Sequence, residues 1–341
     1  MPLLGSGIIP ASGSGGLELS AVTRRAFIPK VIVQIYKATP TLASGLANAQ
    51  TASGGVSSVT VPVQGTAMST AQSSGYDGGF NAPTNPTGIT EADYNLKVVI
   101  VPILFNSMEG IVQLSAAVVP LIEARMNDAG NQIASYLSTQ LFTNAAAASQ
   151  DIDGFPLITD NTKTYGNIAT RATTNSWFAA NVPTPIAASA TPTRQLILTD
   201  IVSAAKANGG EMPNIGVIGP GTWLALANDF VSREQYMITP GAGGSFDQGT
   251  MGARAAFTAL MVAGVPIYID LDQTEGQVLL YNTRYDSFYI HEAAAFAFTG
   301  FASTLPNNKL GYVGALVSVL EHVNVKPKSV TLRTGYGFTV V

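Results

Sequence analysis

Residues 152–178 read IDGFPLITDNTKTYGNIATRATTNSWF, a stretch that combines acids, basic side chains, hydroxyls and aromatic rings. Asp151, directly before it, and Asp153 could serve acid–base chemistry as a pair of carboxylates. Asp153 precedes Gly154 and an aromatic residue, however, and this pattern favours a turn. We therefore interpret the polar side chains as hydrogen-bonding groups for a surface contact. A soluble hydrolase built on residues 151–177 is the enzyme alternative.

A long helix is predicted directly upstream, at about 115–143. Its apolar residues fall mostly four positions apart, at Ile122, Met126, Ile133, Leu137 and Leu141. This spacing places them on one face of a helix. A helix of roughly 25 residues is about 37 Å long, which suits a structural spine.

An extended hairpin is predicted further upstream. Residues 56–65 alternate apolar and polar side chains, the period of a half-buried strand, and Pro62 indicates a sheet edge. Residues 94–105 have strand character again, and the polar segment between the two shows neither a helical nor a strand period. An isolated two-stranded hairpin is marginally stable in water. We therefore expect this one to lie on another molecule.

The two ends of the chain differ in character. Residues 1–20 are rich in Gly and Ser, and residues 23–37 carry a basic cluster. That cluster is either a solvated strand or an arm that lies on acidic neighbours or faces DNA. Beyond residue 180 short elements alternate: helices at 196–211 and 221–237, a strand at 214–220, and strands of one sheet within 265–292. The tail at 313–335 is rich in strand signals.

The composition limits the possible functions. The chain has 341 residues, 46% of them apolar and only 11% charged, against a usual value of about 25%. A compact monomer of this mass exposes roughly 13,000 Å², so its 38 charges, 17 basic and 21 acidic, are sparse. Interface cores are depleted in charge in the same way. The net charge of −4 argues against a dedicated nucleic-acid binder.

Sites for chemistry are scarce in this sequence. There is no cysteine, and the two histidines, His291 and His322, are expected to be hydrogen-bonded structural residues. DLDQTEG (270–276) begins like a calcium loop but has Glu275 at the position of the required Gly, which favours a plain turn. We find no signal peptide and no apolar run of the roughly 18 residues that a membrane helix needs. The sequence therefore predicts no enzyme, no cofactor, no metal site and no membrane contact.

The order of these parts resembles the major capsid proteins of tailed bacteriophages, the Hong Kong 97-type fold shared with encapsulin shells. Residues 152–177 are similar to that family's "I-D-G-L … T-Y-G-G-I-D-R … W" segment, and residues 257–292 to its "F-x-G-I-P-V-x-x-D … G-x-x-Y-x-L-N … Y" run. Two departures stand out. Asn167 replaces the second Gly of the usual pair, and Ala169-Thr170 stands where an acid is common.

The resemblance implies an α+β fold with four parts. Residues 1–40 would form the N-terminal arm and 56–105 the extended hairpin, or E-loop. Residues 41–55, 106–179 and 305–341 would form the peripheral domain with the spine helix, and 180–304 the axial domain. Some family members lock their shells with Lys–Asn bonds. The hairpin tip at 65–92 holds no Lys and Lys97 lies on the predicted returning strand, so we expect no such cross-link.

The function implied is self-assembly through pentamers and hexamers into an icosahedral head that encloses double-stranded DNA. Partners would be further copies of the chain, a portal, a separate scaffolding protein, possible decoration proteins, and DNA in weak non-specific contact. The virion, assembled in the host cytoplasm, would be its location. An encapsulin-like compartment is the other shell alternative, and a surface-layer or fibre protein, which would form open lattices, is a further one. The candidate contacts to neighbours or DNA are Arg24, Arg25, Lys30, Tyr76, Asp77, Phe80, Lys97, Glu123, Arg125, Asp128, Arg171, Trp177, Lys326, Lys328 and Arg333.

Overall fold

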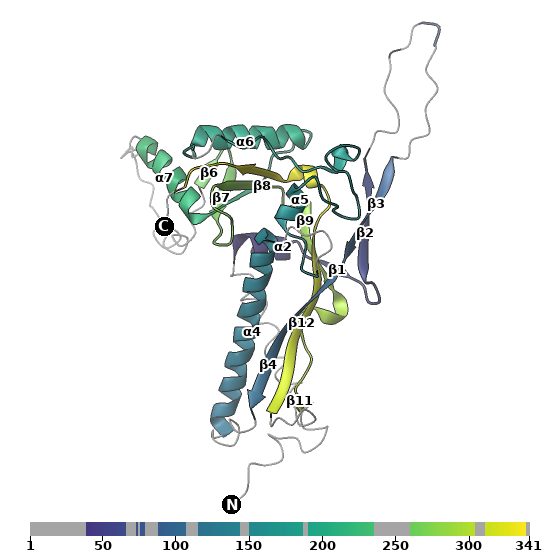
Figure 1. The fold of residues 1–341 in the computed structure, drawn as a ribbon, viewed down its shortest axis with the longest axis vertical. Coiled ribbons are helices and arrows are strands. Elements are labelled where there is room, and N and C mark those ends of the chain that lie inside the picture. The colour runs from purple at the N-terminus through teal and green to yellow at the C-terminus, as the bar shows by residue number, and fades with distance from the viewer. Residues whose placement is uncertain are drawn as a thin grey trace, which may run out of the picture.

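The computed structural model describes residues 39–65, 73, 76–78, 88–106, 115–143, 150–186, 190–234, 260–303 and 311–338. These residues form a broad upper body, a long limb that descends from it, and a hairpin that projects from one side (Figure 1). The predicted arm at 1–38, with its basic cluster, lies outside the described residues. No helix in the described part is long and apolar enough to cross a membrane.

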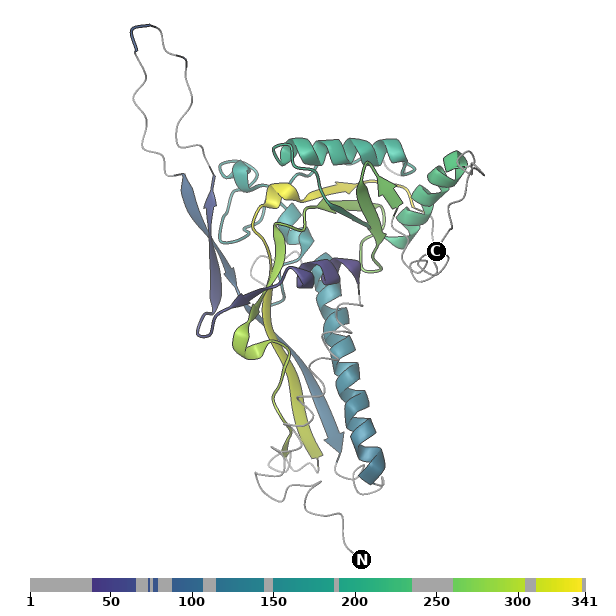
Figure 2. The ribbon, with the colours of Figure 1, turned by 180° about the vertical axis from the view of Figure 1, so that it is seen from behind.

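The limb is built on helix α4 (Ser115–Thr143), where the sequence predicted a helix. The predicted face is buried at Met126, Ile133, Leu137 and Leu141. It packs against strand β4 (Lys97–Asn106) and, at the body, against helices α2 (Pro40–Ala47) and α5 (Phe155–Thr159). Figure 2 shows α2 lying across the upper end of α4.

A six-stranded sheet joins the limb to the body. Its central strand β12 (Gly311–Asn324) pairs antiparallel with β4, from Gly311 opposite Asn106 to Leu320 opposite Lys97. The end of β12 nearer the body pairs with β9 (Asp286–His291), which pairs with β1 (Gln50–Ala52). Two short strands, β10 (Ala297–Phe298) and β11 (Ala302–Ser303), also pair with β12.

A five-stranded sheet forms the centre of the upper body, in the order β13-β8-β5-β7-β6. The strands are β5 (Ile215–Ile218), β6 (Leu260–Val262), β7 (Val265–Ile269), β8 (Gln277–Tyr281) and β13 (Thr331–Thr334). Helix α6 (Arg194–Ala207) covers one face, and α7 (Pro220–Glu234) lies at one end (Figure 1). The helix–strand–helix order predicted from residue 196 onward is confirmed.

The sheet assignment within 265–292 was wrong in one respect. β7 and β8 belong to the five-stranded sheet, but β9 belongs to the six-stranded one. Conversely, β13 lies in the range predicted for the peripheral domain, yet it pairs with β8. The chain passes from one sheet to the other through a turn at Asn282–Tyr285. In this turn the Tyr285 N–H donates a hydrogen bond to the Asn282 carbonyl at 3.1 Å.

The projecting hairpin consists of β2 (Ser58–Gln64) and β3 (Ile89–Asn95), paired antiparallel. The sequence predicted that 94–105 would be the returning strand. That prediction is wrong for 97–105, which belongs to β4 and pairs with β12 instead. Strand signals run almost without a break from Ile89 to Asn106, and only Leu96 separates β3 from β4. Local pattern therefore could not reveal the change of partner.

Candidate functional site

The root of the hairpin rests on residues 150–178 of its own chain. Its inward face includes Val61, Ala92 and Tyr94, which join the main apolar core. The Tyr94 ring packs edge-on against Tyr165, with centroids 5.3 Å apart, and Asp93 N–H donates to the Gly166 carbonyl at 3.1 Å. The stretch that resembles a surface contact in sequence is thus, in large part, an internal platform for the hairpin.

The turn of this platform needs residues that accept a left-handed backbone. Gly166 and Asn167 have φ of +57° and +59°, where Gly is preferred and Asn is among the tolerated residues. A Cβ at Gly166 would also lie 2.9 Å from the Tyr94 ring. This explains the sequence departure at Asn167: it keeps the backbone geometry, while Gly166 supplies the close approach.

Arg171 holds the platform together from inside. It is completely buried, and its guanidinium donates to four backbone carbonyls, those of Leu157, Ile158, Asp160 and Lys163, at 2.7–3.0 Å. Its charge also lies 5.4 Å from the centre of the Tyr165 ring. The prediction that Arg171 contacts a neighbour or DNA is therefore wrong. Trp177 is partly buried against the same core, and a Cβ at Gly65, the residue after β2, would overlap its ring.

A cluster of buried ionisable groups lies where the hairpin root, the platform and the six-stranded sheet meet. The junction cluster consists of Lys97 on β4, Asp153 before α5, Asp286 on β9, and Glu321, His322 and Asn324 on β12. Lys97 Nζ lies 3.6 Å from Glu321 Oε2 and 3.9 Å from Asp153 Oδ1. Its side chain is only 15% exposed, so the expectation that Lys97 lies on the returning strand as a surface contact is also wrong.

The backbone and histidine complete the junction cluster. Glu321 Oε1 accepts hydrogen bonds from the N–H groups of Asp153 and His322, at 2.7 and 3.0 Å. His322 Nε2 lies 2.9 Å from Asp286 Oδ1, and its Nδ1 lies 2.8 Å from the Asp153 carbonyl. Asn324 Nδ2 donates to the same Asp286 oxygen at 3.2 Å. The prediction of a hydrogen-bonded structural histidine is confirmed for His322, and also for His291, whose Nδ1 accepts from Ala293 N–H.

The pKa values of three groups in this cluster are shifted in the same direction, for different reasons. It raises the pKa of Glu321 to about 8 and raises the pKa of Asp153, although Lys97 opposes the shift at Asp153. Burial alone would lower the pKa of His322, but the Asp286 carboxylate outweighs it and raises that pKa. All three groups therefore hold protons more tightly in the folded chain than in the unfolded chain.

The acids of 151–177 do not converge on one reactive centre. Asp151 accepts a hydrogen bond from the Tyr136 hydroxyl, Asp153 belongs to the junction cluster, and Asp160 accepts from the Thr162 hydroxyl at 2.6 Å and pairs with Lys163. Among the described residues no group of three or more His, Asp or Glu is arranged to hold a metal ion. The acids of 151–177, all of them among the described residues, thus offer no acid and base paired around a substrate position.

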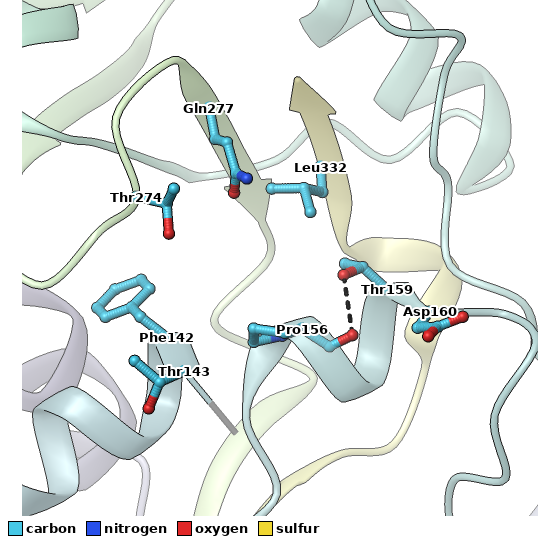
Figure 3. Close-up of a pocket in the computed structure, with 8 residues that line it drawn as sticks. All are labelled: Phe142, Thr143, Pro156, Thr159, Asp160, Thr274, Gln277 and Leu332. Atoms are coloured by element: carbon cyan, nitrogen blue, oxygen red, sulfur yellow. Dashed lines mark hydrogen bonds between the residues drawn. The ribbon is translucent and has the colours of Figure 1, made fainter. Parts of the chain in front are cut away.

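One pocket lies beside these acids, between the end of α4, α5 and the five-stranded sheet (Figure 3). It has a volume of about 530 Å³ and is lined by Phe142, Thr143, Pro156, Thr159, Asp160, Thr274, Gln277 and Leu332. Asp160 is the one ionisable side chain among these lining residues, and hydrogen bonds from Thr162 chiefly lower its pKa. A lone, stabilised carboxylate at the rim is a poor general base.

The other candidate contacts fall into three groups. Lys326 and Arg333 have acidic partners in their own chain, Glu211 at 3.2 Å and Asp200 at 3.6 Å, and Arg125 donates to the Leu104 carbonyl. These internal pairings were not predicted. Asp128 is exposed, Lys328 is half-buried, and Tyr76 and Asp77 form an exposed turn at the far end of the hairpin (Figure 1). Arg24, Arg25, Lys30, Phe80 and the side chain of Glu123 lie outside the described residues.

The limb carries an exposed apolar face that the sequence did not predict. We call it the apolar stripe: four cross-strand pairs of β4 and β12 that point away from α4. The pairs are Val98 with Val319, Ile100 with Val317, Pro102 with Ala315, and Leu104 with Val313. Val98, Ile100 and Leu104 are each more than half exposed. Contiguous apolar patches of this kind mark interaction surfaces.

Comparison with solved structures agrees with this architecture. The capsid of cyanophage A-1(L) matches with a TM-score of 0.61 at 14% identity, over 88% of this chain and 93% of that chain. The capsid of a native GTA particle matches with a TM-score of 0.58 at 14% identity, over 87% and 90%. The chain has the fold of the phage capsid proteins.

This capsid fold extends to other shells. The SrpI encapsulin from Synechococcus elongatus matches with a TM-score of 0.51 at 11% identity, over 92% of this chain and 89% of that chain. No protein-family model and no curated protein matches the sequence. The match to the capsid fold is therefore found through structure. It confirms the fold that the segment at 152–177 and the order of elements predicted.

Proposed function

We propose that this chain is a major capsid protein that assembles through pentamers and hexamers into an icosahedral phage head around double-stranded DNA. The observation that carries the proposal is the match to a phage capsid chain over nearly the whole length of both chains. The proposed role is structural. The described residues offer no convergent catalytic groups, and most of the junction cluster is buried. A portal, a separate scaffolding protein and decoration proteins would be its further partners.

The apolar stripe supports self-assembly on physical grounds. Eight apolar side chains in register, with no charge among them, form one face of the limb. In a lone chain this face would remain in water, at a cost of about 25 cal/mol for each Å² of apolar surface. Other copies of the chain are the partner that a closed shell supplies at every position. We propose that neighbouring copies cover this face.

The proposed division into arm, E-loop, peripheral and axial domains follows the same capsid fold. In that division the projecting hairpin would reach over a neighbour, and Tyr76 and Asp77 at its far end would contact that neighbour. Arg24, Arg25 and Lys30 would face DNA or a neighbour's acids. The absence of a Lys–Asn cross-link stays a prediction, and denaturing electrophoresis of assembled particles would test it by the presence or absence of covalent ladders.

Electron microscopy of the purified chain tests the proposal, with two matched variants. Ile100 in the apolar stripe is 57% exposed and Val202 on α6 is 55% exposed, so lysine should be tolerated by the fold at either position. We expect closed particles from the unmodified chain and from Val202→Lys, and no particles from Ile100→Lys. A chain that stays a monomer at high concentration, or Ile100→Lys particles at full yield, would contradict the proposal.

An encapsulin-type compartment is the second candidate, and the match to the SrpI encapsulin favours it. The two functions differ in what the shell contains. Particles isolated from the cells that make this chain should protect DNA from nuclease if it is a phage head. A discrete co-purifying protein inside nuclease-treated particles, with no protected DNA, would identify the encapsulin function instead.

A further inference from the structure

The junction cluster is physically connected to the root of the hairpin. Leu96 alone separates the end of β3 from Lys97, the first residue of β4. On the other side, the Tyr165 hydroxyl accepts a hydrogen bond from Asn324 N–H at 2.8 Å, and the Tyr165 ring supports Tyr94 of β3. A change in the cluster can therefore reach the hairpin both through the chain and through packing.

The charge balance of the cluster depends on two protons. With Glu321 and His322 protonated, two positive groups, Lys97 and His322, face two negative ones, Asp153 and Asp286. With both deprotonated, one positive group faces three carboxylates in a buried site. Buried charge without a partner is costly, because the interior solvates it poorly. Among the described residues neither Asp153 Oδ1 nor Glu321 Oε2 accepts a hydrogen bond, so when both are ionised they share the Lys97 ammonium, whose Nζ lies 3.9 and 3.6 Å from these two oxygens.

The groups around Glu321 and His322 reinforce this balance. The tyrosines near the cluster are neutral over the range considered, because burial raises their pKa values. Lys97 is the cation that faces Glu321. The groups that surround the pair are Lys97 on β4, Tyr94 on β3, Asp153 and Tyr165 on the platform, Tyr281 on β8, and Asp286 and Tyr289 on β9.

We propose that the junction cluster is a proton-controlled lock on the root of the β2–β3 hairpin, closed when Glu321 and His322 carry protons and loosened when they lose them. The sign follows from linkage. Each group has a higher pKa in the folded chain than in the unfolded chain, so its stabilising effect is present at low pH and is lost as the pH rises through the folded value, about 8 for Glu321. The lock is a property of the single chain and does not depend on shell formation.

Trp177 offers a direct reporter of the closed lock. The chain contains two tryptophans, and Trp177 packs against the end of β2 at Gly65, whereas Trp223 lies in the apolar cluster of the upper body. In a Trp223→Phe background, emission and acrylamide quenching report on Trp177 alone, at the end of the β2–β3 ladder farther from Lys97. We expect Trp177 to be shielded at pH 6 and to become more quenchable, with red-shifted emission, at pH 9. Light scattering at each pH checks that the assembly state does not change between the two measurements.

Two variants in this background separate the lock from a general effect of pH. Glu321→Gln keeps the shape and the acceptor for Asp153 N–H but cannot ionise, so the change in quenching near pH 8 should be lost. Glu292→Gln, at an exposed carboxylate outside the cluster, should keep the full change. Equal quenching at pH 6 and 9 before these substitutions, or a full response in Glu321→Gln, would overturn the proposal.

A third variant, Asp153→Asn, covers the case in which Glu321→Gln does not fold, as judged by circular dichroism at pH 6. Asp153→Asn removes a neighbouring carboxylate whose charge raises the pKa of Glu321, so Glu321 should lose its proton more easily and the midpoint of the Trp177 transition should move to lower pH. An unchanged midpoint would overturn the proposal. Failure of the proposed shell function would leave all of these readouts unaffected, because each is measured on the chain in one fixed state.

Discussion

Removal of the Arg171 side chain should destabilise the platform more than its position in a polar stretch suggests. In Arg171→Ala the four carbonyls of Leu157, Ile158, Asp160 and Lys163 lose their donors. Hydrogen bonds from a charged group contribute about 1.5–3 kcal/mol each, and unpaired buried acceptors carry their own penalty.

The net effect is smaller than the sum of these contributions. Removal of the guanidinium also removes the several kcal/mol that its burial costs, and water can enter the space that it leaves. We therefore expect Arg171→Ala to lower the free energy of unfolding by about 3–5 kcal/mol. Arg171→Lys keeps the charge but loses the planar fork that reaches several acceptors at once, so about half of that loss should remain.

Urea unfolding of the dispersed chain, followed by circular dichroism, measures these differences by linear extrapolation. Arg284→Ala is the matched control, because the Arg284 side chain is 76% exposed and lies 3.8 Å from its partner Glu211. Its loss should stay within about 0.5 kcal/mol, as for most exposed ion pairs. If Arg171→Ala cost less than about 1 kcal/mol, Arg171 would not be the internal brace described here.

Three further substitutions test other parts of the fold. Leu137→Ala on the buried face of α4 should lower the free energy of unfolding by about 2–5 kcal/mol in the same urea assay; a loss like that of a surface position would contradict the burial of this face. Gly166→Ala should undock the hairpin root, because the new Cβ meets the Tyr94 ring and the backbone there has positive φ; faster proteolysis of 89–95 than in the unmodified chain is the expected result, and equal rates would contradict it. Glu275→Ala should lower the melting temperature, because Glu275 accepts from Gly221 N–H and Thr222 N–H at the start of α7, and loss of such a cap costs about 1 kcal/mol; an unchanged melting temperature would show that the cap is dispensable.

Periodic elements were predictable from sequence because their signal is local. The apolar face of α4 repeats with the helical period from Ile122 to Leu141, and no tertiary contact is needed to recognise it. The strand pairings were not local in this sense. β3 and β4 follow one another almost directly, yet one pairs back along the chain with β2 and the other pairs with β12, more than 200 residues further on. Which edge a strand finds is decided by the assembled core.

The polar residues of the platform show a second limit. The sequence singled out the stretch that holds Arg171 and Asp153 but assigned its polar side chains to a surface contact, because polar residues are mostly exposed. A buried arginine is recognisable only when its acceptors are in place, and these are carbonyls of the neighbouring turn. The junction cluster is harder still, since Asp153 and Glu321 are 168 positions apart. The Glu321-His322 pair within an apolar tail was the one visible signal.

The strand pair β4–β12 combines two functions that can be separated experimentally. At the end where Lys97 lies opposite Leu320, the strand pair contributes to the junction cluster, next to the hairpin root. From Val98 to Leu104 the outer face of the strand pair is the apolar stripe. The buried end limits the geometry of one chain, because every charge there needs a partner of the same chain. The exposed face limits nothing within the chain and gains stability only when another surface covers it.

A charge introduced at Ile100 should therefore abolish particles while Trp177 still responds to pH, and Glu321→Gln should abolish the pH response of Trp177 while particles still form. If either substitution produced both defects, the two ends of the strand pair would be coupled, and assembly would have to act through the hairpin root.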